Sequence, residues 1–135
     1  MAIDISPLER AIARLEEALD IYRQDPSQSL IRDGLVQRFE FTFELSRKLL
    51  KRYLEENAVP SEDFDVIGFA DLIRIGNENG LLLGNWPRWR TYRDMRAKTS
   101  HTYNEMTALE VVAGIPAFLE EARYLRDRLR ERPDR

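Results

Sequence analysis

The chain has 135 residues, a formal net charge of −3 and no cysteine. This length fits one domain, residues 1–135, that buries a core without metals or cross-links. The missing cysteines exclude disulfides, thiolate zinc sites and cysteine nucleophiles. No stretch approaches the roughly 20 apolar residues of a membrane helix, and the N-terminal MAIDISPLER lacks the apolar region of a secretory signal. We therefore expect a cytoplasmic protein that has no membrane association.

The first predicted helix begins at Ser6 and ends near Gln24. The run SPLE at its start has the pattern of a capping box with proline in the first turn. Pro26 cannot continue the helix, and it lies in a turn that follows. Apolar residues recur with helical spacing and predict one buried stripe, which consists of Leu8, Ile12, Leu15, Leu19 and Tyr22.

The second predicted helix is long, from about Ser29 to about Asn57. One stripe is formed by Leu35, Phe39, Thr42, Ser46, Leu49 and Tyr53, and it is widened by Val36, Phe43, Leu50 and Leu54. Phe41 and Leu45 fall on a different side. A helix that is apolar on more than one face is either central in its domain or covered by a partner chain.

Three shorter patterns complete the chain. Ser61 is predicted to cap a third helix that contains Phe64, Ile67, Ala70 and Leu72. The glycine- and asparagine-rich segment 76–87 is predicted to be a loop or a broken helix. A fourth helix starts near Pro87. A capping box at Thr107 opens the last helix, whose stripe is Val111, Ile115, Phe118, Ala122, Leu125 and Leu129. The fold class is therefore an all-α, antiparallel up-and-down bundle of four to five helices.

Basic residues are concentrated near the fourth helix. Eighteen of the 21 basic residues of the chain are arginine, and arginine is well suited to bidentate contact with phosphate. Between residues 87 and 101 a single acid, Asp94, accompanies Arg88, Arg90, Arg93, Arg96 and Lys98, with Trp86, Trp89 and Tyr92 interleaved. This mixture predicts an RNA- or phosphate-binding surface. The alternative is an arginine-rich composition that produces an ordinary solvated face.

The run RAKTSHTYNE holds the only histidine of the protein, His101, with Arg96 five residues before it and Tyr103 two after. On a straight helix, five residues separate two side chains by roughly 140° around the axis. The three side chains therefore converge only if the helix ends inside the run, as its serine and threonines favour, or if a second copy of the chain completes the site. The alternative is a histidine at a helix C-terminus beside a solvated arginine.

Two segments together carry a resemblance to a known family. RDGLVQRFEFTFELSRKLLKRYL and RAKTSHTYNE resemble the nucleotidyltransferase substrate-binding proteins, a branch of the HEPN superfamily that includes toxins of HEPN–minimal nucleotidyltransferase toxin–antitoxin pairs. Arg96, His101 and Tyr103 match the R-x4-H-x-Y motif of the family. The resemblance implies a HEPN-like bundle that forms a homodimer, with the two motifs facing each other across the interface.

The resemblance also implies an activity and a partner. Active members cleave RNA without a metal or cofactor, so Arg96 and His101 would be catalytic. His101 would act as general base or acid, and Arg96 would stabilise the charge that develops on the phosphorane. A separately encoded minimal nucleotidyltransferase would adenylylate Tyr103, and the added charge and bulk would block the RNA cleft.

One position departs from the family pattern. The residue after the motif arginine is usually polar, and here it is Ala97. A missing hydrogen bond at that point is expected to weaken RNA cleavage. Two alternatives to a ribonuclease therefore stay open: a non-catalytic subunit that binds a substrate or nucleotide for a nucleotidyltransferase, and a purely structural dimeric bundle.

Overall fold

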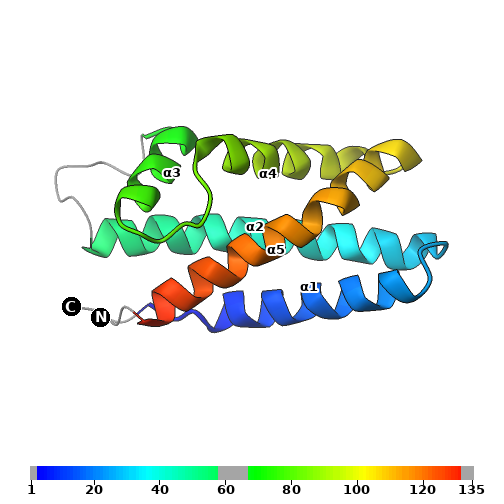
Figure 1. The fold of residues 1–135 in the computed structure, drawn as a ribbon, viewed down its shortest axis with the longest axis horizontal. Helices are drawn as coiled ribbons and strands as arrows, with labels where there is room; N and C mark the ends of the chain where they lie inside the picture. Colours follow the sequence, from blue (N-terminus) through cyan, green and yellow to red (C-terminus); the bar gives the residue numbers. More distant parts are fainter. Residues whose placement is uncertain (1–2, 58–66, 132–135) are drawn as a thin grey trace.

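Two long helices form an antiparallel hairpin at the start of the chain. In the computed structural model, which describes residues 3–57 and 67–131, α1 (Ser6–Gln24) and α2 (Ser29–Asn57) lie side by side (Figure 1). In the turn between them, the Asp25 carboxylate accepts hydrogen bonds from the backbone N–H and the hydroxyl of Ser27, at 3.1 and 2.6 Å. The predicted bounds of both helices are confirmed.

The start of α1 differs in detail from the prediction. All five residues of the predicted stripe are buried, but Ser6 does not cap the helix. It is already the first helical residue, and the Asp4 carboxylate accepts a hydrogen bond from its N–H at 2.9 Å. The predicted capping box is therefore wrong. Ser6 lies inside the first turn of the helix, and its own N–H binds the carboxylate of Asp4, two residues earlier.

Helix α2 is the central element, because it packs against every other helix of the described chain. Its two buried hydroxyls are satisfied locally. Thr42 Oγ1 donates to the Arg38 carbonyl at 2.7 Å, and Ser46 Oγ donates to the Thr42 carbonyl at 2.8 Å. Polar residues can therefore lie in the apolar stripe without leaving an unpaired group. Of the two off-stripe residues, Phe41 is 55% exposed as expected, whereas Leu45 is partly buried and packs against the core.

Only part of the predicted third helix falls on described residues, since Ser61 and Phe64 lie outside them. There, α3 runs over Phe69–Glu78: it contains Ala70 and Leu72, begins after Ile67, and extends into the segment that was expected to be a loop or a broken helix. Ala70 is exposed, and the buried side of α3 consists of Leu72, Ile73, Ile75 and Gly76. A Cβ on Gly76 would lie 2.9 Å from Cδ1 of Leu82. This glycine is therefore a close-packing residue inside the helix and not a helix breaker.

The remaining helices enclose an aromatic core. Helix α4 (Trp86–Lys98) continues into a short 3-10 helix, η1 (Thr99–His101), and α5 (Glu105–Glu131) then runs diagonally across the bundle (Figure 1). The Phe118 ring on α5 lies 5.0 Å from Phe39 and 5.3 Å from Tyr92, centroid to centroid, in edge-to-face contacts. Trp89 is fully buried beside them. All six residues of the predicted α5 stripe are buried, as expected.

The cap of α5 is Asn104 and not Thr107. Asn104 Oδ1 accepts a hydrogen bond from the Thr107 N–H at 3.2 Å, and the helix begins at Glu105. Asparagine is among the best residues at this position. The capping-box pattern at Thr107 therefore placed the cap three residues too late.

A buried carboxylate fastens the α3–α4 loop to α5. Glu121 accepts hydrogen bonds from the backbone N–H groups of Leu83 and Gly84, at 2.7 and 2.8 Å. A Cβ on Gly84 would lie 2.7 Å from Cδ of Arg88 and 2.9 Å from Glu121 Oε1, so only glycine fits without displacement. Burial raises the pKa of the Glu121 carboxyl, although both hydrogen bonds act in the opposite direction.

The regular structure of residues 3–57 and 67–131 is entirely helical. The predicted all-α bundle is therefore confirmed. Within this described part of the chain, no helix is both long and apolar enough to span a bilayer.

Candidate active site at the end of α4

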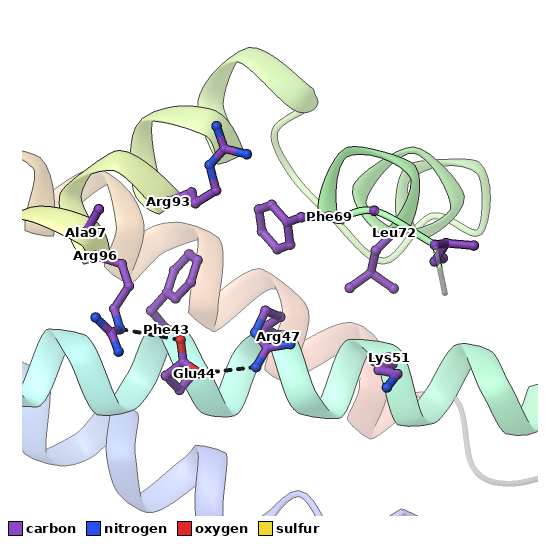
Figure 2. A pocket seen from close by; sticks show the side chains of 11 residues that line it. Phe43, Glu44, Arg47, Lys51, Phe69, Leu72, Arg93, Arg96 and Ala97 are labelled. Atoms are coloured by element: carbon purple, nitrogen blue, oxygen red, sulfur yellow. Dashed lines mark hydrogen bonds and ion pairs between the residues drawn. The ribbon is translucent and has the colours of Figure 1, made fainter. Parts of the chain in front are cut away.

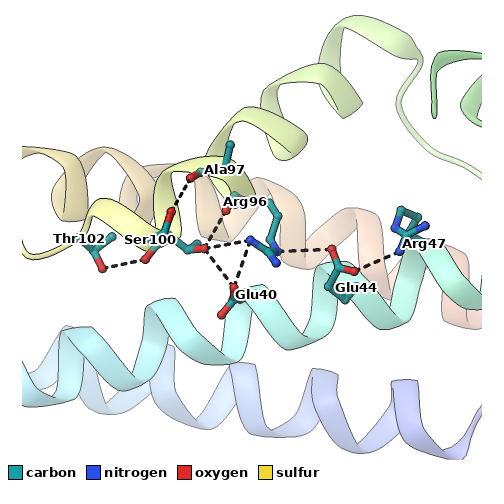
Figure 3. Close-up of polar contacts among 8 residues, drawn as sticks. Glu40, Glu44, Arg47, Arg96, Ala97, Ser100 and Thr102 are labelled. Carbon is teal, nitrogen blue, oxygen red and sulfur yellow. Dashed lines mark hydrogen bonds and ion pairs between the residues drawn. The ribbon is translucent and has the colours of Figure 1, made fainter. Parts of the chain in front are cut away.

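The predicted helix break inside RAKTSHTYNE is confirmed. Helix α4 ends at Lys98, and η1 follows. The hydroxyls of this segment donate to carbonyls three residues earlier in the chain: Thr99 to Arg96 at 2.7 Å, Ser100 to Ala97 at 3.2 Å, and Thr102 to Thr99 at 3.2 Å (Figure 3). The local sequence therefore specifies the break through its own side chains.

Arg96 is held against α2 by two carboxylates. Its Nη1 lies 3.1 Å from Glu40 Oε2, and its Nε lies 3.4 Å from Glu44 Oε1 (Figure 3). The Nε–H makes no hydrogen bond, so the contact with Glu44 is an ion pair only. Thr99 Oγ1 completes the cluster at 3.3 Å from Glu40 Oε2. The Arg96 side chain as a whole is about one-third exposed, while its Nε is buried, so the residue is anchored but not fully enclosed.

Glu40 and Glu44 are residues that the sequence analysis missed. They are four positions apart on α2 and therefore share one face of that helix. Their spacing within FEFTFE was a usable signal, but nothing local in the sequence identifies Arg96, more than 50 positions later, as their partner. These carboxylates now supply the support for Arg96 that a polar residue at position 97 was expected to give.

His101 and Tyr103 project from the break into solvent. Tyr103 is 88% exposed, and the two rings lie 6.2 Å apart, centroid to centroid, in an edge-to-face arrangement. Among the contacts of residues 3–57 and 67–131, none joins Arg96 to either ring. One chain therefore brings His101 and Tyr103 together, whereas Arg96 belongs to the α2 side of the site.

The predicted phosphate-binding residues of α4 are exposed, and their side chains have different neighbours. Lys98 pairs with Glu110 of α5 at 3.0 Å. The Arg93 guanidinium lies over the Trp86 ring, 5.1 Å from its centroid. Arg88 lies next to Gly84 on the other flank of the helix, and Arg90 is exposed.

The expected aromatic part of that surface is wrong for two of its three members. Trp89 is fully buried and Tyr92 is 2% exposed, and both contact the core ring of Phe118. Trp86 is partly buried and packs against the core. The helical spacing of the three aromatics reflects a core-facing stripe on α4, so the rings of Trp89 and Tyr92 are not available to stack on nucleic-acid bases.

A groove opens where α2, α3 and α4 meet, beside the Arg96 cluster. Its cavity volume is about 400 Å³, and Figure 2 shows the side chains that line it. We call it the α2–α4 groove. Its lining consists of Phe43, Glu44, Arg47, Lys51, Ile67, Gly68, Phe69, Leu72, Arg93, Arg96 and Ala97.

Comparison with known proteins agrees with this architecture. Residues 3–131 match the family described as nucleotidyltransferase substrate binding protein like. A Haemophilus influenzae protein named as a probable ribonuclease HepT is 37% identical over 138 residues, which cover 96% of this chain and 94% of the relative.

Two solved structures share the fold. One is a Haemophilus influenzae protein described as showing the fold of a substrate-binding domain of a nucleotidyltransferase. It has a TM-score of 0.86 and 36% identity over 94% of this chain and 99% of that one. The other, from Thermus thermophilus, has a TM-score of 0.73 and 33% identity over 91% and 98% of the two chains. The matches extend over nearly the whole chain, and they confirm the predicted family: the protein belongs to the nucleotidyltransferase substrate-binding protein family.

Proposed function

We propose that this protein is the toxin-like partner of a separately encoded minimal nucleotidyltransferase, and that it cleaves RNA without a metal at Arg96 and His101. The observation that carries the proposal is the helix break after α4. It exposes His101 next to Tyr103 while Arg96 stays anchored on α2. The relative named as a probable ribonuclease supports the same reaction class.

The proposed reaction is an internal transfer within RNA. A general base removes the proton of a ribose 2′-OH, and the 2′-oxygen attacks the adjacent phosphorus. The bond to the 5′-oxygen breaks as a general acid protonates that oxygen, which leaves a 2′,3′-cyclic phosphate and a 5′-hydroxyl. Histidine can perform either proton transfer. A guanidinium such as Arg96 stabilises the additional negative charge on the phosphorane.

A homodimer would bring together the groups that one chain keeps apart. One chain supplies one histidine, and its Arg96 makes no contact with that histidine within the described residues. Two copies facing each other would supply two histidines, one for each proton transfer. Exposed apolar side chains adjoin the break at the start of α5, where Met106 is 73% and Leu109 45% exposed. Such residues are typical of a surface that another chain covers.

We expect a dimer in solution, with a mass about twice the 15.9 kDa of one chain. Sedimentation equilibrium at micromolar concentration measures this directly. We also place the exposed Phe41 ring of α2 in the proposed interface, so Phe41→Ser should favour the monomer because it removes that apolar surface. Leu83→Ser is the matched control, since Leu83 is similarly exposed but lies in the α3–α4 loop. A wild-type mass of one chain would exclude a site shared between copies.

Tyr103 is the proposed acceptor of the partner's modification. The phenol oxygen would attack the α-phosphorus of ATP, release pyrophosphate and lose its proton, which leaves AMP in a phosphodiester. The ring is almost fully exposed and close to His101. The product places a negative charge and a bulky nucleoside beside the histidine, so it would exclude an RNA phosphate by repulsion and by volume.

Tyr103→Phe should therefore keep RNA cleavage but abolish AMP transfer. The phenol has no role in the proton transfers, whereas its oxygen is the acceptor atom. Mass spectrometry after incubation with the partner nucleotidyltransferase and ATP detects the modification. Tyr124→Phe should be modified like the wild type. AMP found on the Tyr103→Phe protein would show that the acceptor is another residue.

The function itself is tested by incubating the purified protein with RNA in EDTA. Fragments with 2′,3′-cyclic phosphate and 5′-hydroxyl ends support the proposal. The second candidate is a non-catalytic subunit that binds a substrate for the nucleotidyltransferase. It is favoured by the two carboxylates on Arg96, which already neutralise this guanidinium. Absence of cleavage both in the wild type and in Ala97→Asn, which restores the commoner polar residue, would replace the ribonuclease with this candidate.

A further inference from the structure

Arg32 is a largely buried arginine near the start of α2. It lies seven residues before Phe39, so it is on the core-facing side of the helix. Its side chain is 13% exposed, compared with 34% for Arg96. Its Nε is buried and makes no hydrogen bond within the described part of the chain. A buried guanidinium is costly unless it is paired, so the carboxylates beside Arg32 are its main compensation.

Two carboxylates approach Arg32, and one of them belongs to α5. The Nη1 of Arg32 lies 3.6 Å from Glu105 Oε1, and its Nε lies 4.0 Å from Asp33 Oδ1. Both acids are mostly exposed, so they reach the guanidinium from the surface. Glu105 is the first residue of α5. The pair therefore ties the start of α2 to the start of α5.

The start of α5 is connected directly to His101. The His101 carbonyl accepts a hydrogen bond from the Asn104 N–H at 3.2 Å. Asn104 in turn caps α5 through the Thr107 N–H. One turn of chain, residues 101–104, thus separates the histidine from the helix that Arg32 contacts. A displacement of the first turn of α5 would therefore move His101 with it.

Helix α2 holds the other end of the break as well. Thr99 is the first residue of η1, and its Oγ1 lies 3.3 Å from Glu40 Oε2 (Figure 3). Glu40 comes eight residues after Arg32, which is about two turns of helix. The break, residues 99–105, is therefore attached to one helix at its first and at its last residue. His101 lies between the two attachments.

We infer that Arg32 is a positioning residue for His101. It fixes the start of α5 through Glu105, and so sets the orientation of the turn that presents the histidine. An apolar side chain would fill a core-facing position at lower cost than a buried charge, and Arg32 is too enclosed to bind RNA itself. The contact with Glu105 is what an apolar residue could not provide. The consequence for catalysis rests on the proposed RNA cleavage, whereas the consequence for the break does not.

Amide hydrogen exchange followed by NMR tests the inference without any reaction. Arg32→Met replaces the guanidinium with an apolar side chain, and Glu105→Ala removes the same pair from the exposed side. Both variants should speed exchange of the Asn104 and Thr107 N–H groups by about threefold or more, because the start of α5 opens more often. The thermal unfolding midpoint of Glu105→Ala should stay unchanged, because the side chain that is lost is exposed.

Two comparisons isolate the pair from general effects. Arg38→Met removes an arginine of the same helix that pairs with Glu17 of α1 at 2.9 Å, and it should leave exchange at Asn104 unchanged. Glu105→Ala also removes a charge that favours any helix N-terminus, so the double variant is needed. Arg32→Met should add little to Glu105→Ala, because the two residues act through one contact. Arg32→Gln takes the place of Arg32→Met if the latter does not fold.

Kinetics then test the consequence for cleavage. Arg32→Met should lower kcat about 10–100-fold, because a catalytic group that is misplaced by about 1 Å loses that much. KM should change by less than about threefold, because the change removes no group that we expect to bind the RNA. Arg38→Met should leave both constants unchanged.

Each result counts for or against the inference. Faster exchange in both single variants, without additivity in the double variant, establishes the positioning contact, even if the wild type cleaves no RNA and the proposed function is thereby lost. Unchanged exchange at Asn104 in Arg32→Met and in Glu105→Ala would overturn it. Additive effects would also overturn it, because the two residues would then act independently. Cleavage that falls through KM alone would make Arg32 an RNA-binding residue instead.

Discussion

Replacing His101 by alanine is expected to reduce RNA cleavage by about 10²–10⁴-fold, because general acid–base catalysis usually contributes that much to a rate. His101 is exposed at the end of η1, so the change removes no core contact. The free energy of unfolding should therefore fall by no more than about 0.5 kcal/mol. Gel analysis of labelled RNA fragments in EDTA measures the rate, and urea unfolding measures the stability.

Matched variants separate the role of His101 from a general effect on the break. Ser100→Ala alters the adjacent exposed residue and should keep cleavage, whereas Arg96→Ala should lose it as His101→Ala does. If the wild type cleaves RNA and His101→Ala cleaves it equally well, the histidine is an ordinary helix-end residue and the proton transfers belong to other groups.

Glu121→Ala is expected to lower the free energy of unfolding by about 2–4 kcal/mol. The change leaves the N–H groups of Leu83 and Gly84 without their acceptor, and each buried unsatisfied group costs about 1–3 kcal/mol. Glu120→Ala is the control at the exposed neighbouring position, where an effect within about 0.5 kcal/mol is expected. Urea unfolding followed by circular dichroism at pH 7 gives both values. Equal stability of the two variants would show that the loop is held by other contacts.

The difference in free energy of unfolding between the wild type and Glu121→Ala should change with pH in one direction. Burial raises the pKa of Glu121 in the folded protein. A carboxyl whose pKa is raised in the folded protein binds its proton more tightly in the folded state. Its contribution to the free energy of unfolding is therefore complete below the pKa of the unfolded state, and it declines as the pH rises through the pKa of the folded state. The advantage of the wild type over Glu121→Ala should therefore be larger near pH 4 than at pH 7. An advantage that grows with pH would contradict the raised pKa.

Local sequence patterns were sufficient for most of the fold. Helical spacing identified the buried stripes of α1, α2 and α5, since a core-facing side chain recurs every three to four residues. Pro26 marked the turn between the first two helices. The hydroxyl-rich run after Lys98 indicated the helix break, because its side chains compete for the terminal carbonyls. The same run and α2 carried the family resemblance.

Errors arose where two local interpretations had similar physical support. Aromatics interleaved with arginines on α4 suggested a stacking surface, but Trp89 and Tyr92 supply the core contacts of that helix. Gly76 suggested a loop, but its missing Cβ permits close packing against Leu82. Composition alone cannot separate these cases, because the answer depends on which neighbour covers the residue.

The candidate site shows what only the tertiary structure decided. The sequence by itself determined the buried faces of α1, α2 and α5, and the helix break before His101. Packing of α4 on α2 decided that Glu40 and Glu44 hold Arg96, and the meeting of α2, α3 and α4 created the groove lined by cations from two of them. Helical periodicity acts within a few residues along the chain. Ion pairs and cavities join residues that are distant in sequence, so they exist only once the helices have packed.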